Sequence, residues 1–249
     1  MTRDELRARA AVLGFHGLVD RWDELADAPW VEALLDGEDA ARKRRSLERR
    51  LKGAQLGAFK SMADFDWKWP TRIARDVVEE LLTLRFIREA TNVVFRGPNG
   101  VGKSMISLNI AHAAVLQGYT VCYTTASAML AKLASQDGSI ALQRQLRRYQ
   151  RYQLLVVDEV GYLSYDNRHA DLLFEVVNRR YRERSIVIST NRPFAEWNEV
   201  FPSAACVVAL VDRLVHDAEV VPIEAESYRV KEAEENTARR AAARKKRRP

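Results

Sequence analysis

The residues with the clearest chemical pattern form the segment from Gly97 to Ser104, which reads GPNGVGKS. This spacing fits G-x-x-x-x-G-K-[ST] (Walker A), in which glycines let backbone N–H groups turn toward phosphate oxygens while the lysine reaches the outermost phosphates. A strand-like run, Asn92 to Phe95, precedes the segment, and apolar residues at helical spacing follow from Met105 to Leu116. A phosphate-binding loop needs this placement between a strand and a helix N-terminus. The residues predicted to contact phosphate are Gly97, Pro98, Asn99, Gly100, Val101, Gly102, Lys103 and Ser104.

Two acidic residues end a second apolar run. Leu154 to Val157 suits a strand buried on both faces, and Asp158 and Glu159 follow it at the carboxyl end, where ligands bind in open α/β sheets. Asp158 is predicted to hold Mg²⁺ together with the Ser104 hydroxyl, as in other phosphate-loop nucleotide hydrolases (Walker B). Glu159 is then free to polarise a water aimed at the γ-phosphate.

Three further polar residues have weaker patterns. Asn191 ends the strand candidate IVIST, where its amide could hydrogen-bond both the attacking water and the γ-phosphate. Arg213 falls in a helical segment, and Arg229 follows the last strand candidate. A guanidinium neutralises charge on a transferring phosphoryl group, and a neighbouring subunit can supply one in trans. Taken singly, an arginine fits a solvated surface role equally well.

Strand and helix patterns alternate around these residues. The strand candidates are NVVF, YTVCYTT, LLVVDEV, SIVIST and EVVPIEA, with helical stretches between them. This alternation predicts an α/β fold with a mainly parallel sheet flanked by helices. Apolar residues at helical spacing predict a small helical domain over residues 1–70, followed by the nucleotide-binding domain over 71–235 and a basic tail over 236–249.

The composition of the 249-residue chain, 47% hydrophobic and 30% charged, suits one sizeable core and a small accessory domain. The longest apolar stretch, Ala204 to Val211, is too short to span a membrane, so a cytoplasmic location without membrane contact is the default expectation. Residues 236–249 hold seven basic residues and no acid, and a second basic cluster lies between Arg42 and Lys60. Such blocks suggest polyanion contact, although the tail fits a solvated, disordered segment equally well.

A family resemblance emerges from the order of GPNGVGKS, LLVVDEVGYL, STNRPFAEW and VDRLVHDAEVVPIEAESYR. It resembles that of the IstB transposition-helper ATPases, relatives of the DnaC helicase loaders in the AAA+ superfamily, over residues 47–230. The resemblance implies an Mg²⁺-dependent ATPase, stimulated by DNA and by self-assembly, that helps a transposase select or prepare target DNA. It further implies duplex DNA as a partner and a homo-oligomer with ATP sites at subunit interfaces.

The same resemblance assigns roles to single residues. It identifies Asn191 as a sensor, Arg213 as the finger presented to the next subunit's nucleotide, and Arg229 as a second sensor. The chain departs from the family pattern between Phe201 and Leu210, where FPSAACVVAL lacks the acidic residue expected there. This departure affects the predicted contact between subunits.

In the initiator-type AAA+ proteins that the chain resembles, the helical segment after the second core strand faces a central channel. Here that segment spans residues 126–151. Its basic residues are Lys132, Arg144, Arg147, Arg148 and Arg151, and the four arginines recur at helical steps on one face. The resemblance predicts that these side chains contact DNA phosphates.

Two alternative functions stay open. One is a replicative helicase loader of the DnaC type, which shares the ATPase core, and the other is a small-molecule phosphotransferase, for which the loop alone would suffice.

Overall fold

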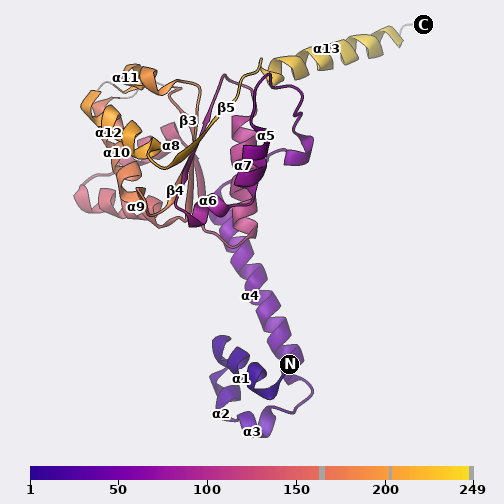
Figure 1. Ribbon diagram of the computed structural model, residues 1–249. Coiled ribbons are helices and arrows are strands. Elements are labelled where there is room, and N and C mark those ends of the chain that lie inside the picture. Colours follow the sequence, from indigo (N-terminus) through magenta and orange to yellow (C-terminus); the bar gives the residue numbers. More distant parts are fainter. Residues whose placement is uncertain (163–165, 202–203, 247–249) are drawn as a thin grey trace. The chain divides into compact units, whose positions relative to one another are not determined.

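The computed structural model of the chain describes residues 1–162, 166–201 and 204–246 (Figure 1). It divides the chain into two compact units, Met1–Lys52 and Gly53–Pro249. This division falls earlier than the boundary predicted near Pro70. The reason is that the segment after residue 52 packs on the second unit, where Asn109 Nδ2 donates to the carbonyl of Lys60 over 2.9 Å.

The first unit is a small helical domain. Its helices are α1 (Arg3–Val12), α2 (His16–Asp20), α3 (Trp22–Leu25) and most of α4 (Val31–Ala54). Helix α1 begins at a capping box, in which Thr2 Oγ1 accepts from the backbone of Glu5 and the Glu5 carboxylate accepts from the backbone of Thr2. Leu13, Trp22 and Leu35 are buried together in its core. Helices therefore form where the apolar spacing of the N-terminal segment predicts them.

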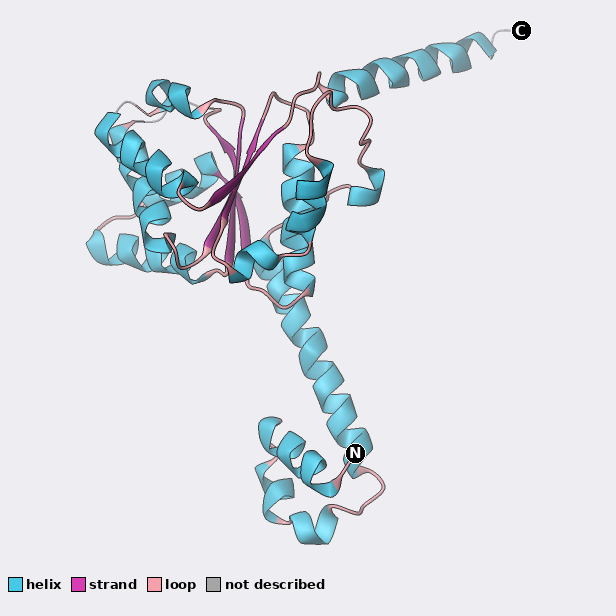
Figure 2. Cartoon of the chain, viewed as in Figure 1, coloured by secondary structure: helices cyan, strands magenta, loops and turns pink. Residues whose placement is uncertain are grey.

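The second unit is built on a five-stranded parallel sheet flanked by helices (Figure 2). Its strands are β1 (Asn92–Arg96), β2 (Val121–Thr125), β3 (Leu154–Val160), β4 (Ser185–Thr190) and β5 (Ala218–Pro222). They lie in the order β2-β3-β4-β1-β5, and each neighbouring pair runs parallel. The predicted α/β class is confirmed, and each of the five strand candidates forms a strand.

Helices cover both faces of this sheet. One face carries α7 (Lys103–Leu116), on which α5 (Arg75–Leu82) and the short helix η1 (Met62–Asp64) pack. The other face carries α8 (Ala126–Ala134), α10 (Asn167–Arg180) and α12 (Ala204–Val215), with α9 (Ser139–Arg151) packed on α8 and α10. The remaining helices are α6 (Arg85–Arg88), η2 (Phe194–Glu196), α11 (Trp197–Val200) and α13 (Tyr228–Lys246).

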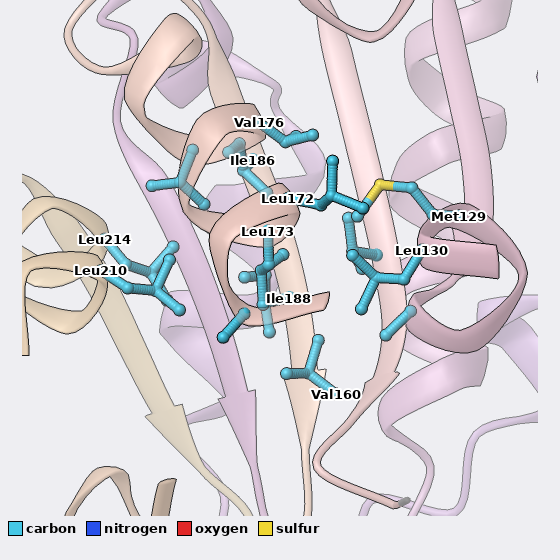
Figure 3. Close-up of a cluster of buried hydrophobic side chains, with 14 of the residues drawn as sticks. Met129, Leu130, Val160, Leu172, Leu173, Val176, Ile186, Ile188, Leu210 and Leu214 are labelled. Atoms are coloured by element: carbon cyan, nitrogen blue, oxygen red, sulfur yellow. The ribbon is translucent and has the colours of Figure 1, made fainter. Parts of the chain in front are cut away.

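The larger part of the core lies between the sheet and the second of these helical layers. Figure 3 shows the labelled side chains of α8, α10 and α12 gathered against β3 and β4. Met129, Leu130, Leu173 and Ile188 are almost fully buried there. Unbroken apolar runs suit strands covered on both faces, which explains the runs Leu154 to Val157 in β3 and Ile186 to Ile188 in β4.

Three predicted segments differ in detail. Apolar residues at helical spacing predict one helix from about Ile73 to Ile87. The structure has two helices there, α5 and α6, because Leu84 adopts a left-handed conformation with φ of +65°. Residues 126–151 likewise form two helices, separated at Gly138. The tail, predicted to be disordered from Asn236, continues α13 as far as Lys246, in keeping with the helix propensity of its Ala, Arg and Lys residues.

None of the helices in the described ranges is long and apolar enough to cross a membrane.

A buried arginine ties α9 to the sheet. The Arg180 side chain, at the end of α10, is 1% exposed, and its guanidinium donates to the carbonyls of Tyr149, Tyr152 and Ser185, each over 2.7 Å. Burial lowers the pKa of Arg180 to about 9. This one side chain therefore pairs the backbone at the end of α9 with the backbone at the start of β4.

Replacing Arg180 with alanine should destabilise the second unit by about 3–5 kcal/mol, because the carbonyls of Tyr149, Tyr152 and Ser185 lose a charged donor in a buried setting. Urea denaturation of the full chain would measure this loss. The matched control is Arg168→Ala on the same helix, which removes an exposed arginine and should change stability by less than about 0.5 kcal/mol. Equal stability of the two variants would contradict the role given to Arg180.

Candidate functional site

The predicted chemical residues meet at the carboxyl edge of the sheet. Strands β1 and β4 pair with Arg96 opposite Thr190, and β4 pairs with β3 through Val157 and Ile188. All three strands run in the same direction, so the residues that follow them emerge side by side. The phosphate loop, the Asp158–Glu159 pair and Asn191 therefore share one edge, as predicted for an open α/β sheet.

Lys103 lies inside the loop. Its side chain is 4% exposed, and Nζ donates to the carbonyls of Gly97 and Pro98 over 2.7 and 2.6 Å. Burial lowers the pKa of Lys103 to about 8, against the attraction of the nearby Asp158 carboxylate. An amine held on backbone carbonyls inside a glycine-rich turn can exchange them for phosphate oxygens, which are stronger acceptors.

The loop backbone fits an anion. Gly102 caps α7 in a left-handed conformation with φ of +104°, and no side chain caps the first turn of that helix. A Cβ at Gly102 would lie 2.6 Å from the ring of Phe65, and one at Gly97 would collide with the carbonyl of Ile223. The glycines are therefore required, and the free N–H groups and positive dipole end of α7 favour a phosphate.

A bulge in β3 gives its two acidic residues, Asp158 and Glu159, different surroundings. The register of β3 against β4 shifts between Val157 and Val160, and Glu159 within this bulge has φ of +61°. Asp158 is 3% exposed, whereas Glu159 is exposed and lines the cleft described below. Bulges beside functional sites often redirect a side chain, and a non-glycine residue at positive φ is uncommon. The bulge thus keeps Asp158 within the sheet and turns Glu159 toward solvent.

Asp158 can take part in a metal site only together with other ligands. Within the described ranges, no cluster of three His, Cys, Asp or Glu side chains could hold a metal by itself. Magnesium prefers few protein ligands together with phosphate oxygens and waters. The Ser104 hydroxyl and the Asp158 carboxylate therefore fit an ion that a nucleotide's phosphates help to hold.

The loop opens into a cleft of about 660 Å³, a volume suited to a nucleotide-sized ligand. Three segments line it: the phosphate loop with Glu159, the linker before α5, and the start of α13. The lining residues outside the loop include Lys60, Asp64, Phe65, Asp66, Trp69, Pro70, Tyr162, Tyr228, Arg229 and Glu232. Apolar rings and charged groups thus stand beside the phosphate loop in one cavity.

Most of this wall was not anticipated from the sequence. By its sequence the segment DFDWKWP is typical of an aromatic, proline-ended linker, yet it is fastened to α13 by an ion pair of 3.1 Å between Asp66 and Lys231. A second pair, Lys60 with Glu232 at 2.8 Å, lies beside it, and Trp69 Nε1 donates to a carbonyl near the start of α13. The signal available in the sequence was the presence of three aromatic residues, Phe65, Trp67 and Trp69, within this short linker.

The three weaker candidates, Arg229, Asn191 and Arg213, lie in different surroundings. Arg229 lies in the first turn of α13 and lines the cleft, and its charge contributes to the lowered pKa of Lys103. Asn191 follows β4, and its buried Oδ1 has no partner among the described residues, as an acceptor reserved for a water or ligand would. Arg213 lies on α12 with its guanidinium 4.7 Å from the centre of the Phe174 ring, and it is not among the described residues that line the cleft.

The predicted DNA-contacting arginines gather in a groove of about 720 Å³. Arg144, Arg147, Arg148 and Arg151 of α9 line it together with Thr120 and Tyr152. No ion pair within the described residues neutralises these four arginines. Lys132, on α8, is exposed but does not line the groove. Thr120 and Tyr152 lie just before β2 and β3, so this groove lies at the amino ends of these strands. The cleft beside the phosphate loop lies at the carboxyl ends.

Comparisons with known proteins agree with this fold and with an ATP-binding family. A family model described as IstB-like ATP binding protein matches residues 11–236. The chain is 36% identical over 198 residues to the insertion sequence IS21 ATP-binding protein of Pseudomonas aeruginosa, a match that covers 80% of this chain and 75% of that protein. It is 30% identical over 224 residues to the insertion sequence IS5376 ATP-binding protein of Geobacillus stearothermophilus, which covers 86% and 89% of the two chains.

Among solved structures, the crystal structure of DnaI is similar, with a TM-score of 0.54 over 69% of this chain and 90% of that one. The two sequences are 16% identical, so this likeness shows the fold alone. The fold is the AAA+ form of the phosphate-loop α/β architecture, as the motif order predicts.

The lowered pKa of Lys103 predicts a pH-dependent affinity for nucleotide. Above pH 8 the free protein loses the ammonium charge, so a polyphosphate must bind together with a proton, and affinity should fall by about tenfold for each pH unit above the pKa. Titration with a fluorescent ATP analogue at pH 7, 8 and 9 would measure this. A Lys103→Arg variant keeps its charge over this range and should show a flat profile. A flat profile for the parent protein would contradict the prediction.

Proposed function

The chain belongs to the family of IstB-like ATP binding proteins, and from this membership we propose that it is an ATPase that assembles on duplex DNA and helps a transposase select or prepare target DNA. Hydrolysis, DNA contact and the transposase go beyond the family's ATP binding. Features of the second unit support the first two, and the insertion-sequence relatives support the third.

The observation that carries the proposed hydrolysis is the meeting of Lys103, Asp158 and Glu159 at one sheet edge. Lys103 binds the outer phosphates, and Ser104 and Asp158 hold Mg²⁺, which offsets the charge on the phosphates when bound. The exposed Glu159 carboxylate, turned out by the bulge, accepts a proton from the attacking water. Asn191, whose amide oxygen has no partner in the described part of the chain, orients that water.

Arg213 supports the proposed self-assembly. Its guanidinium packs on Phe174, away from the cleft of its own chain. Within one subunit, therefore, no arginine of α12 neutralises charge on the transferring phosphoryl group. We assign Arg213 to the nucleotide of the neighbouring subunit, which makes ATP sites shared between copies of the chain.

The groove on α9 supports the proposed DNA contact. Four arginines without carboxylate partners in the described residues would attract a phosphate backbone and release its counterions. The relatives belong to insertion sequences, which favours the transposition helper over the helicase loader and over a small-molecule phosphotransferase.

Replacing Glu159 with glutamine should preserve nucleotide binding and abolish turnover. The amide cannot accept the water's proton, whereas Lys103, Ser104 and Asp158 are unchanged, and loss of a positioned base costs about 10²–10⁴-fold in rate. Phosphate release with and without duplex DNA would measure turnover, and equilibrium titration would measure binding. Turnover close to that of the parent protein would exclude Glu159 as the base.

Reversing Arg147 and Arg148 to glutamate should weaken binding to every duplex. Each lost phosphate contact should also flatten the plot of log affinity against log salt by about one unit. The matched control is the double reversal Arg85→Glu with Arg88→Glu, which makes the same change in net charge on exposed residues of α6. Fluorescence anisotropy with duplexes of unrelated sequence would measure both quantities.

The basic tail, residues 236–249, is the alternative to the α9 groove as the DNA-binding element. If deletion of residues 236–249 abolishes DNA binding while the double reversal of Arg147 and Arg148 leaves affinity and salt dependence unchanged, the tail is the DNA-binding element and the groove is not.

A further inference from the structure

Both oxygens of the Asp158 carboxylate accept hydrogen bonds from hydroxyl groups. The Tyr123 phenol donates to Oδ2, and the Ser189 hydroxyl donates to Oδ1. The carboxylate is 3% exposed, so its orientation depends on these neighbours and not on water. Neither Tyr123 nor Ser189 belongs to a sequence motif, so the sequence alone does not identify either as part of the site.

Tyr123 lies beside Asp158, one of the two residues predicted to hold Mg²⁺. It lies in β2, two residues before Thr125, which pairs with Asp158 across the strands. Burial, with the charge of Asp158, raises the pKa of its phenol well above the usual value, and the Ser104 hydroxyl at the start of α7 acts in the opposite direction.

Ser189 connects the carboxylate to the bulge. It lies in β4, and its Oγ accepts from the backbone N–H of Glu159 over 3.0 Å while donating to Asp158. The same N–H of Glu159 lies 3.1 Å from Asp158 Oδ1. One serine thus holds both the carboxylate of Asp158 and the backbone from which the Glu159 side chain projects.

We propose that Tyr123 and Ser189 are positioning residues for magnesium–nucleotide binding, which fix the Asp158 carboxylate so that the remaining lone pair of Oδ2 faces the ion. This inference rests on the proposed nucleotide function. Oδ1 accepts from both the Ser189 hydroxyl and the Glu159 N–H, whereas Oδ2 accepts from the Tyr123 phenol. Since a carboxylate oxygen has two lone pairs, Oδ2 keeps one for the ion or its water. Partners of this kind orient a ligand group, and their removal typically costs about 10–100-fold in metal affinity.

The first test is Tyr123→Phe, which removes the phenol hydroxyl and keeps the ring. A fluorescent ATP analogue is titrated in EDTA and at a series of Mg²⁺ concentrations. Affinity in EDTA should match that of the parent protein within about twofold, because the loop and Lys103 are unchanged. The Mg²⁺ concentration that gives half of the affinity increase should rise by about tenfold.

The matched control is Tyr119→Phe. This residue lies just before β2, and its hydroxyl accepts from the side chain of Arg88 at the protein surface. It should leave the Mg²⁺ dependence unchanged.

Ser189→Ala should produce a similar shift in Mg²⁺ dependence. It should also lower turnover at saturating Mg²⁺, because the Glu159 backbone loses an acceptor. Its control is Ser107→Ala on α7, which removes a buried hydroxyl that has no partner among the described residues.

The outcomes separate this inference from the proposed function. If the parent protein binds the analogue more tightly with Mg²⁺ and Tyr123→Phe behaves like Tyr119→Phe, the positioning role is wrong although the nucleotide site stands. A lower melting temperature for Tyr123→Phe with an unchanged Mg²⁺ dependence would make the tyrosine structural and would also overturn it. If the parent protein does not bind the analogue at all, the proposed function itself fails.

Discussion

The parallel register of β1, β4 and β3 is the constraint on which the rest of the site depends. Parallel pairing ends the three strands at one edge, where the phosphate loop, Asp158 and Asn191 follow them. These groups are far apart in the sequence, and no local interaction could gather them. A change in strand order or direction would separate the lysine from the acids even if every motif were intact.

The bulge in β3 resolves a conflict that regular pairing would create. Successive residues of a strand point to opposite faces, so a regular β3 would bury one of the two acids in an apolar layer. Instead the shifted register and the positive φ of Glu159 turn that side chain outward, while Asp158 stays buried among hydroxyl donors. A metal-holding carboxylate and a water-activating carboxylate thereby become neighbours with different exposures.

The two ends of the strands carry separate clusters of basic residues. The cleft with Lys103 lies at the carboxyl ends, and the groove with the α9 arginines lies at the amino ends of β2 and β3. Nucleotide and nucleic acid could therefore bind without competing for the same cations. Arg180 holds the end of α9 to the start of β4, which gives the groove a fixed relation to the sheet.

The sequence by itself determined the phosphate loop, the strand-end acids, the α/β class and the family, because these depend on short patterns whose spacing reflects local backbone geometry. Only the tertiary structure decided that Tyr123 and Ser189 hold Asp158, that the aromatic linker and α13 wall the cleft, and that Arg213 stands apart from it. The break at Leu84 also went undetected, since leucine gives no signal for a left-handed residue. Contacts between distant segments leave no periodic trace in the sequence, because they arise from strand register and helix packing.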